Sequence, residues 1–178
     1  IERLADRLEI VSRERIAEEM TKLLSLERAS AGLRLLVDTG LGMRDSIRGH
    51  QRLSNFFVGL NRPRLSPHET AFQQLAKLGF GSRDVRHIVL THLDFDHAGG
   101  IEDFPEATVH VLASEREAAE LREGFIGRRR YRPMQWDEGV TWRTYKPHGD
   151  TWEGFECVKS LQGVPADILL VPLKGHTI

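Results

Sequence analysis

The segment THLDFDHAGG, residues 91–100, constrains the fold of this chain more than any other part of the sequence. It follows an apolar run at 85–90 that predicts a buried β-strand. Several potential metal ligands directly after a buried strand favour a metal site at the strand end over ordinary surface polarity. Four such ligands stand within six positions of one another: His92, Asp94, Asp96 and His97.

The spacing of these side chains predicts how they share metal ions. Alternate residues of an extended chain point to the same face, so we expect His92, Asp94 and Asp96 to face one way and the first two to share an ion. Asp96 and His97 lie where the chain turns into a loop or a helix start, and they can address a second ion. Imidazole and carboxylate groups together suit zinc, iron or manganese.

Two glycines close the segment, at positions 99 and 100. Without side chains they allow a sharp turn or the close approach of another backbone.

The rest of the sequence alternates predicted strands and helices, which favours an α/β fold. A strand at 33–37 runs into Asp38-Thr39-Gly40, where Asp38 is expected to tie down its turn close to the metals. Ser114 is expected to cap a helix over 114–122. Further helices are predicted at 1–28 and 69–78, further strands at 108–112, 155–158 and 168–173, and irregular connections at 41–67 and 124–150, the second with one strand.

Composition limits the possible partners. At 178 residues the chain is long enough for one domain with a substantial core. Its net charge of −1 creates no field that would attract nucleic acid, and no apolar run reaches the roughly 20 residues that span a bilayer. The single cysteine, Cys157, excludes an internal disulfide framework and fits a reducing compartment. We therefore expect a cytoplasmic protein with a small-molecule substrate and no nucleic-acid or membrane partner; its oligomeric state is not indicated.

The signature segment resembles that of a known family. Thr91-His92-x-Asp94-x-Asp96-His97-x-Gly99-Gly100 is similar to the T-H-x-H-x-D-H-x-G-G signature of the metallo-β-lactamase superfamily. Asp38-Thr39-Gly40 and the later Gly175-His176-Thr177 resemble two further segments of that family. The resemblance implies an α/β fold, an αββα sandwich of two mixed β-sheets flanked by helices. It also implies that residues 30–178 form this domain and that 1–29 are a helical N-terminal segment.

The same resemblance implies a metal site and a reaction. His92, Asp94 and His176 would hold one divalent ion, and Asp96 and His97 would contribute to a second; zinc is the ion expected. Hydroxide activated at the metals would attack an ester, lactone or related carbonyl, with Asp96 orienting it and carrying a proton to the leaving group. The pattern is closest to lactonase-like and esterase-like members.

Two departures from the family pattern keep alternatives open. Asp94 stands where the family has a second histidine, and a carboxylate there shifts the expected preference toward iron or manganese. A diiron redox protein of the same fold therefore stays open. The family's bridging aspartate and last histidine would follow Ile178, so we expect the domain to lack its C-terminal part, and a truncated non-catalytic member also stays open.

Other candidate groups have ordinary explanations. The run Arg128-Arg129-Arg130 can receive an anionic substrate, but a solvated surface run is favoured. His87 and His110 lie in predicted strands and are expected to be structural or on the surface.

Overall fold

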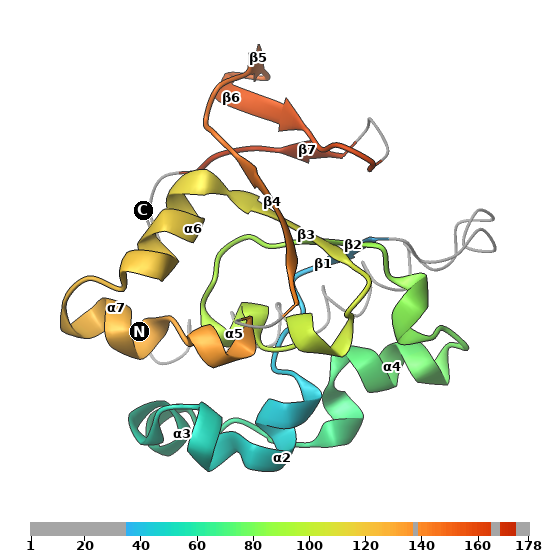
Figure 1. Ribbon diagram of the computed structural model, residues 1–178, viewed down its shortest axis with the longest axis vertical. Helices are drawn as coiled ribbons and strands as arrows, with labels where there is room; N and C mark the ends of the chain where they lie inside the picture. The colour runs from blue at the N-terminus through green and yellow to red at the C-terminus, as the bar shows by residue number, and fades with distance from the viewer. Residues whose placement is uncertain (1–34, 137–138, 165–167, 174–178) are drawn as a thin grey trace, which may run out of the picture. The chain divides into compact units, whose positions relative to one another are not determined.

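In a computed structural model of the chain, residues 35–136, 139–164 and 168–173 are described (Figure 1). The helix predicted over 1–28 and the candidate ligand His176 lie outside these residues. The predicted domain boundary at 29/30 therefore stays a prediction.

The described strands form two sheets. The first contains β1 (Leu35–Val37), β2 (His87–Val89), β3 (Thr108–Leu112) and β4 (Thr141–Tyr145), in that order and all parallel. The second contains β5 (Asp150–Trp152), β6 (Phe155–Ser160) and β7 (Leu169–Leu170), all antiparallel. The expected α/β fold with two sheets is confirmed, and among the described strands parallel pairing is confined to one sheet and antiparallel pairing to the other.

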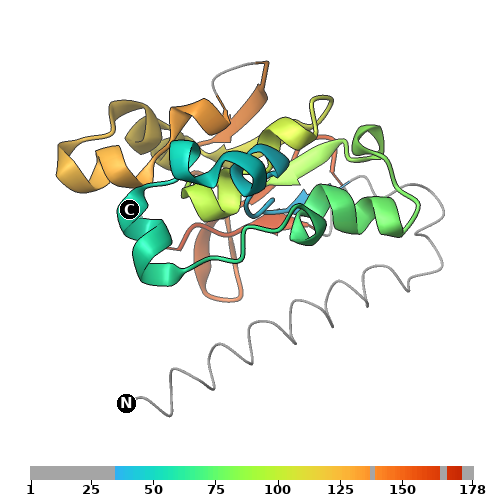
Figure 2. The ribbon, with the colours of Figure 1, turned by 90° about the horizontal axis from the view of Figure 1, so that it is seen from below.

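The two faces of the parallel sheet bury different partners. On one face Leu36, Ile88 and Val109 lie side by side in register, each at most 6% exposed. On the other face Val89 and Tyr145 join Leu161 in a cluster that includes Leu170 of β7, which links the two sheets. Figures 1 and 2 show α2, α4 and α5 on the side of the parallel sheet opposite β5–β7.

Helices connect the parallel strands, as a parallel sheet requires. None of the helices in the described residues is long and apolar enough to cross a membrane. They are α2 (Met43–Arg52), α3 (Asn55–Asn61), α4 (Ala71–Lys77), α5 (Phe95–Ala98), α6 (Ala113–Leu121) and α7 (Gly124–Arg130), with short 3₁₀ turns η2 (Pro67–Glu69), η3 (Ser82–Asp84), η4 (Ile101–Asp103) and η5 (Pro133–Gln135).

Three sequence predictions about these connections were wrong. Residues 41–67, predicted to be irregular, contain α2 and α3, and the connection predicted at 124–150 contains α7. Tertiary contacts explain α2, because at the start of the helix the Met43 N–H donates a hydrogen bond of 2.9 Å to the carboxylate of Asp103, 60 positions away. Ser114 does not cap α6, because β3 ends at Leu112 and the helix begins with the next residue.

A buried chain of polar side chains crosses the sheet on the face toward β7. His87 Nδ1 lies 3.0 Å from His110 Nε2, and His110 Nδ1 lies 2.7 Å from the Tyr145 hydroxyl, which also accepts a hydrogen bond from Gln162 N. His110 is fully buried, and its burial, together with the charges of His87 and Arg143, lowers its pKa to about 4. The expectation that these two histidines are structural is confirmed.

We expect the buried His110 to make the free energy of unfolding depend on pH. Unfolded His110 binds a proton near pH 6.5, whereas the folded protein binds it only near pH 4, so stability falls as the pH drops between these values. The loss between pH 7 and 4.5 should be about 2 kcal/mol. Urea unfolding at both pH values should show a smaller loss for His110→Gln than for wild type, whereas the exposed control His148→Gln should match wild type. An equal loss in His110→Gln would contradict the assignment.

Candidate metal centre

The signature segment connects β2 to α5 at the end of the parallel sheet. Past the end of β2 the Leu90 N–H still donates to the His110 carbonyl, the backbone of Asp94 is extended, and α5 begins at Phe95. Asp96 and His97 therefore lie on a helical turn. Of the loop and the helix start that the sequence left open here, the helix start is observed. The expectation that Asp96 continues the extended alternation of residues 92 and 94 was wrong, because the helix starts one residue before it.

Asp94 occupies the N-cap of α5 but does not cap the helix with its side chain. An N-cap aspartate normally accepts a hydrogen bond from the backbone of the first turn. Here Oδ2 lies 3.4 Å from His92 Nε2, while Oδ1 accepts a hydrogen bond from the Nε–H of Arg130. The carboxylate is thus directed away from its usual local partner and toward the candidate ligand His92.

Asp38 holds the segment from the neighbouring strand. It follows β1 with a φ of 50°, a left-handed conformation that aspartate tolerates better than most residues. Its carboxylate accepts hydrogen bonds from Thr91 N at 2.9 Å, from the Thr91 hydroxyl at 2.9 Å and from His97 Nδ1 at 3.0 Å. The expectation that Asp38 ties down its turn is confirmed, and the same contacts fix the signature segment to β1.

This network orients both histidines. Because the single proton of the Thr91 hydroxyl is donated to Asp38, its oxygen accepts from His92 Nδ1, 2.7 Å away. Both rings therefore carry their proton on Nδ1, and Nε2 is the nitrogen with a lone pair. The hydrogen bond to Asp38 is also the main cause that raises the pKa of His97, against the opposing effect of burial.

A histidine anchored through one ring nitrogen by a carboxylate or hydroxyl is the usual arrangement in metal sites, because the second nitrogen is then held in position. The centroids of the two rings lie 4.0 Å apart, and His97 Nε2 lies 4.0 Å from Asp96 Oδ2. Two pairs of an imidazole nitrogen and a carboxylate, His92 with Asp94 and His97 with Asp96, thus lie after the end of β2.

The distances test whether these donors fit a metal ion. Two ligands at about 2.1 Å from one tetrahedral ion are about 3.4 Å apart, and the separation of His92 Nε2 from Asp94 Oδ2 is 3.4 Å. The 4.0 Å between His97 and Asp96 is wider. Within the residues that the structure describes, no three His, Cys, Asp or Glu side chains converge to hold an ion. His92 and Asp94 fit as one pair of ligands, and the sequence predicts His176, which lies outside the described residues, as a further ligand.

Glycines 99 and 100 allow Asp45 and Thr39 to approach the backbone of the signature segment closely. Their φ values of −62° and −96° are open to any residue, so no unusual turn explains them. A Cβ on Gly99 would lie 2.3 Å from Oδ2 of the buried Asp45, and one on Gly100 would lie 3.0 Å from Thr39 Cβ. Gly100 N also donates to Thr39 Oγ1 at 3.0 Å. Of the two predicted roles, the close approach of another segment is confirmed.

Two side chains that the sequence did not assign to the site also support it. Arg130, at the end of α7, pairs with Asp94, so the prediction of a solvated arginine run was wrong for this residue, whereas Arg128 and Arg129 are exposed. Glu115 of α6 is fully buried, and its Oε1 accepts a hydrogen bond of 2.8 Å from the N–H of Leu93, the residue between the candidate ligands His92 and Asp94. No signal in the sequence identifies Glu115, because an acidic residue in a helix is ordinarily solvated.

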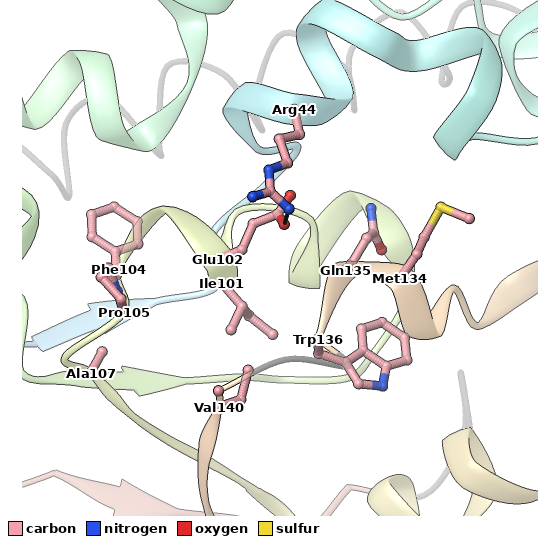
Figure 3. A pocket seen from close by; sticks show the side chains of 11 residues that line it. Arg44, Ile101, Glu102, Phe104, Pro105, Ala107, Met134, Gln135, Trp136 and Val140 are labelled. Carbon is pink, nitrogen blue, oxygen red and sulfur yellow. Dashed lines mark hydrogen bonds and ion pairs between the residues drawn. The ribbon is translucent and has the colours of Figure 1, made fainter.

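The hollows in this part of the molecule include a cavity and an apolar groove. The cavity in Figure 3, about 350 Å³, is lined by side chains that include Arg44, Glu102 and Trp136, and none of the four candidate ligands lines it. A more apolar groove of about 510 Å³ includes Asp94 and Arg130 in its wall. The other residues of that wall are mainly apolar or aromatic: Phe56, Phe57, Phe95, Phe125 and Ile126, with Ser54 and Arg129.

Comparison with known proteins identifies the family. A family model described as the metallo-beta-lactamase superfamily matches residues 28–176. The chain belongs to this superfamily. A second model, described as a probable RNA and SrmB-binding site of polymerase A, matches residues 1–42, most of which precede the described residues.

The relatives of this superfamily member include hydrolases. A probable metallo-hydrolase of Mycobacterium tuberculosis is 43% identical over 143 residues, which are 80% of this chain and 46% of the relative. An N-acyl homoserine lactonase of Bacillus cereus is 32% identical over 94 residues, 52% of this chain and 37% of the relative. The chain thus spans less than half the length of these relatives.

A solved structure shares the fold. It is that of an N-acyl homoserine lactone hydrolase with the product N-hexanoyl-L-homoserine bound at its catalytic metal centre. The TM-score is 0.51 at 24% identity, over 68% of this chain and 46% of that one.

Proposed function

We propose that the chain carries the metal centre of a hydrolase that cleaves an ester, a lactone or a related carbonyl substrate. The observation that carries this proposal is the hydrogen-bond network from Asp38 and Thr91, which holds both histidines by Nδ1 and sets Nε2 beside the aspartates. A merely structural pair of histidines would not require both rings to be aligned in this way. Membership of the superfamily and the lactonase relatives support the same reaction class.

The residues have separate roles in this proposal. His92 and Asp94, together with His176, would hold one divalent ion, and His97 and Asp96 would contribute to a second. The ions would be zinc, with iron or manganese as alternatives. When bound, they would polarise the carbonyl and lower the pKa of a bound water toward ~7.

Asp96 is the residue that would move the proton. Its side chain is 46% exposed, the most accessible of the four, and it neighbours His97 Nε2. From this position a carboxylate oxygen can accept a proton from the attacking water and return it to the leaving group. The cytoplasmic location and the absence of a nucleic-acid partner stay predictions.

The apolar groove supports a substrate with an apolar part. It borders Asp94, and Phe56, Phe125 and Ile126 in its wall are each at least 64% exposed. Exposed aromatic side chains beside a polar site favour a ligand that combines a reactive polar group with an apolar tail. The lactonases among the relatives act on N-acyl homoserine lactones, which have this composition.

Removal of metal tests the proposed function. The purified protein should contain a divalent ion and hydrolyse an aryl ester or a γ-lactone, and a chelator should abolish both. Zinc, manganese or ferrous iron, each added to the stripped protein, should restore hydrolysis. The ion that restores the highest rate is the preferred one. Full activity in protein shown to be metal-free would refute the proposal, and so would a failure of the protein to bind any of the three ions.

A further inference from the structure

The ion pair between Arg130 and Asp94 is the feature of the site that the family signature does not predict. Arg130 Nε donates to Asp94 Oδ1 across 36 positions of sequence, and the two side chains are only 19% and 14% exposed. The Arg130 guanidinium also lies 5.7 Å from the ring of Tyr131, which is buried. An arginine in such surroundings is held in place, unlike one in an exposed surface pair.

The pair restores the charge that the departure from the signature removes. A carboxylate at position 94, in place of a neutral imidazole, lowers the charge of the site by one. The guanidinium is always protonated and raises it by one again. The sum for Asp94 and Arg130 is therefore zero, the same as for a neutral histidine.

The pair also selects which oxygen of Asp94 is presented. Oδ1 is engaged by Arg130, whereas Oδ2 is the oxygen 3.4 Å from His92 Nε2. Hydrogen bonds of this kind to ligating carboxylates fix their orientation. Arg130 thus both compensates and orients Asp94.

We propose that Arg130 is a positioning residue for Asp94. Its charge offsets that of the carboxylate, and its hydrogen bond to Oδ1 leaves Oδ2 to take the place of the ligating nitrogen of the signature histidine. This inference rests on the proposed metal site. It predicts that residues 94 and 130 can be replaced together without loss of metal binding, but not one at a time. Loss of Arg130 removes a positive charge, which by itself favours a dication, but it leaves Asp94 unoriented, and we expect the lost orientation to outweigh the charge. An imidazole at position 94 leaves the guanidinium facing the metal without a carboxylate.

A double-mutant cycle measured by zinc binding tests this coupling. Zinc titrated calorimetrically into metal-free wild type, Asp94→His, Arg130→Met and the double variant gives four affinities. Each single variant should bind zinc at least tenfold more weakly than wild type, in the 10–100-fold range typical of lost supporting contacts. The double variant should recover to within about threefold of wild type, a pattern that independent residues do not produce.

The cycle includes a matched control. Arg128→Met removes the same charge from the same helix, but Arg128 is exposed. Combined with Asp94→His, it should give no recovery. If Arg130→Met does not fold, Arg130→Gln, which keeps a hydrogen-bond donor without the charge, takes its place.

The outcomes separate this inference from the proposed function. Zinc binding by wild type with additive effects in the cycle overturns the role of Arg130 and leaves the metal site standing. Recovery with Arg128→Met also overturns it, because any nearby charge would then suffice. Failure of wild type to bind zinc, manganese or iron overturns both proposals.

Discussion

Asp96→Asn is expected to lower hydrolysis by about 10²–10⁴-fold, the range typical of lost general acid–base catalysis. Asparagine has nearly the same size as aspartate, and the Asp96 side chain is 46% exposed, so the fold should persist. An amide cannot accept a proton from water and return it to the leaving group. Steady-state kinetics on the ester or lactone hydrolysed by wild type provides the measurement.

Metal content must be measured on the same samples, because a neutral amide is also a poorer ligand than a carboxylate. Asp84→Asn is a matched control, since Asp84 is an exposed carboxylate in η3, outside the signature segment. It should leave the rate unchanged. If Asp96→Asn keeps its full metal complement and the wild-type rate, Asp96 has no part in the reaction.

Gly99→Ala is expected to cost about 3 kcal/mol or more of unfolding free energy, at the upper end of the range for overpacked sites. The added methyl would lie 2.3 Å from Asp45 Oδ2 and 2.7 Å from the Phe95 carbonyl oxygen. Asp45 cannot yield easily, because it is fully buried and accepts hydrogen bonds from Arg52 Nε at 2.7 Å and Gln135 Nε2 at 2.8 Å. Urea unfolding of the purified variant measures the loss.

Gly59→Ala is the control for this substitution. Gly59 lies within α3, and a Cβ there would meet no atom within 4 Å. Alanine should be neutral or stabilise the protein by up to about 1 kcal/mol, because it favours helix more than glycine does. Equal stability changes in the two variants would show that the contact between α2 and the signature segment is not as close as described.

Much of the fold was predictable from local sequence. β3 was predicted at its observed bounds, β1 and β2 within a few residues, and α4 was predicted from its apolar spacing. These elements have apolar patterns that depend only on their own residues. α2, α3 and α7 were missed because Arg-rich and Gly-containing stretches give no clear period, and contacts such as Asp45 with Gln135, 90 positions apart, stabilise them.

The sequence by itself determined the chemistry of the site and its place at a strand end. His92, Asp94, Asp96, His97 and the two glycines are local features, because ligand spacing and the preceding apolar strand lie within 16 consecutive residues, 85–100. Only the tertiary structure decided how these candidate ligands are held. Asp38 reaches His97 across 59 positions and Arg130 reaches Asp94 across 36. Such pairs form because parallel strands bring distant strand ends to one edge and helix packing sets a side chain beside them, and no local pattern records either event.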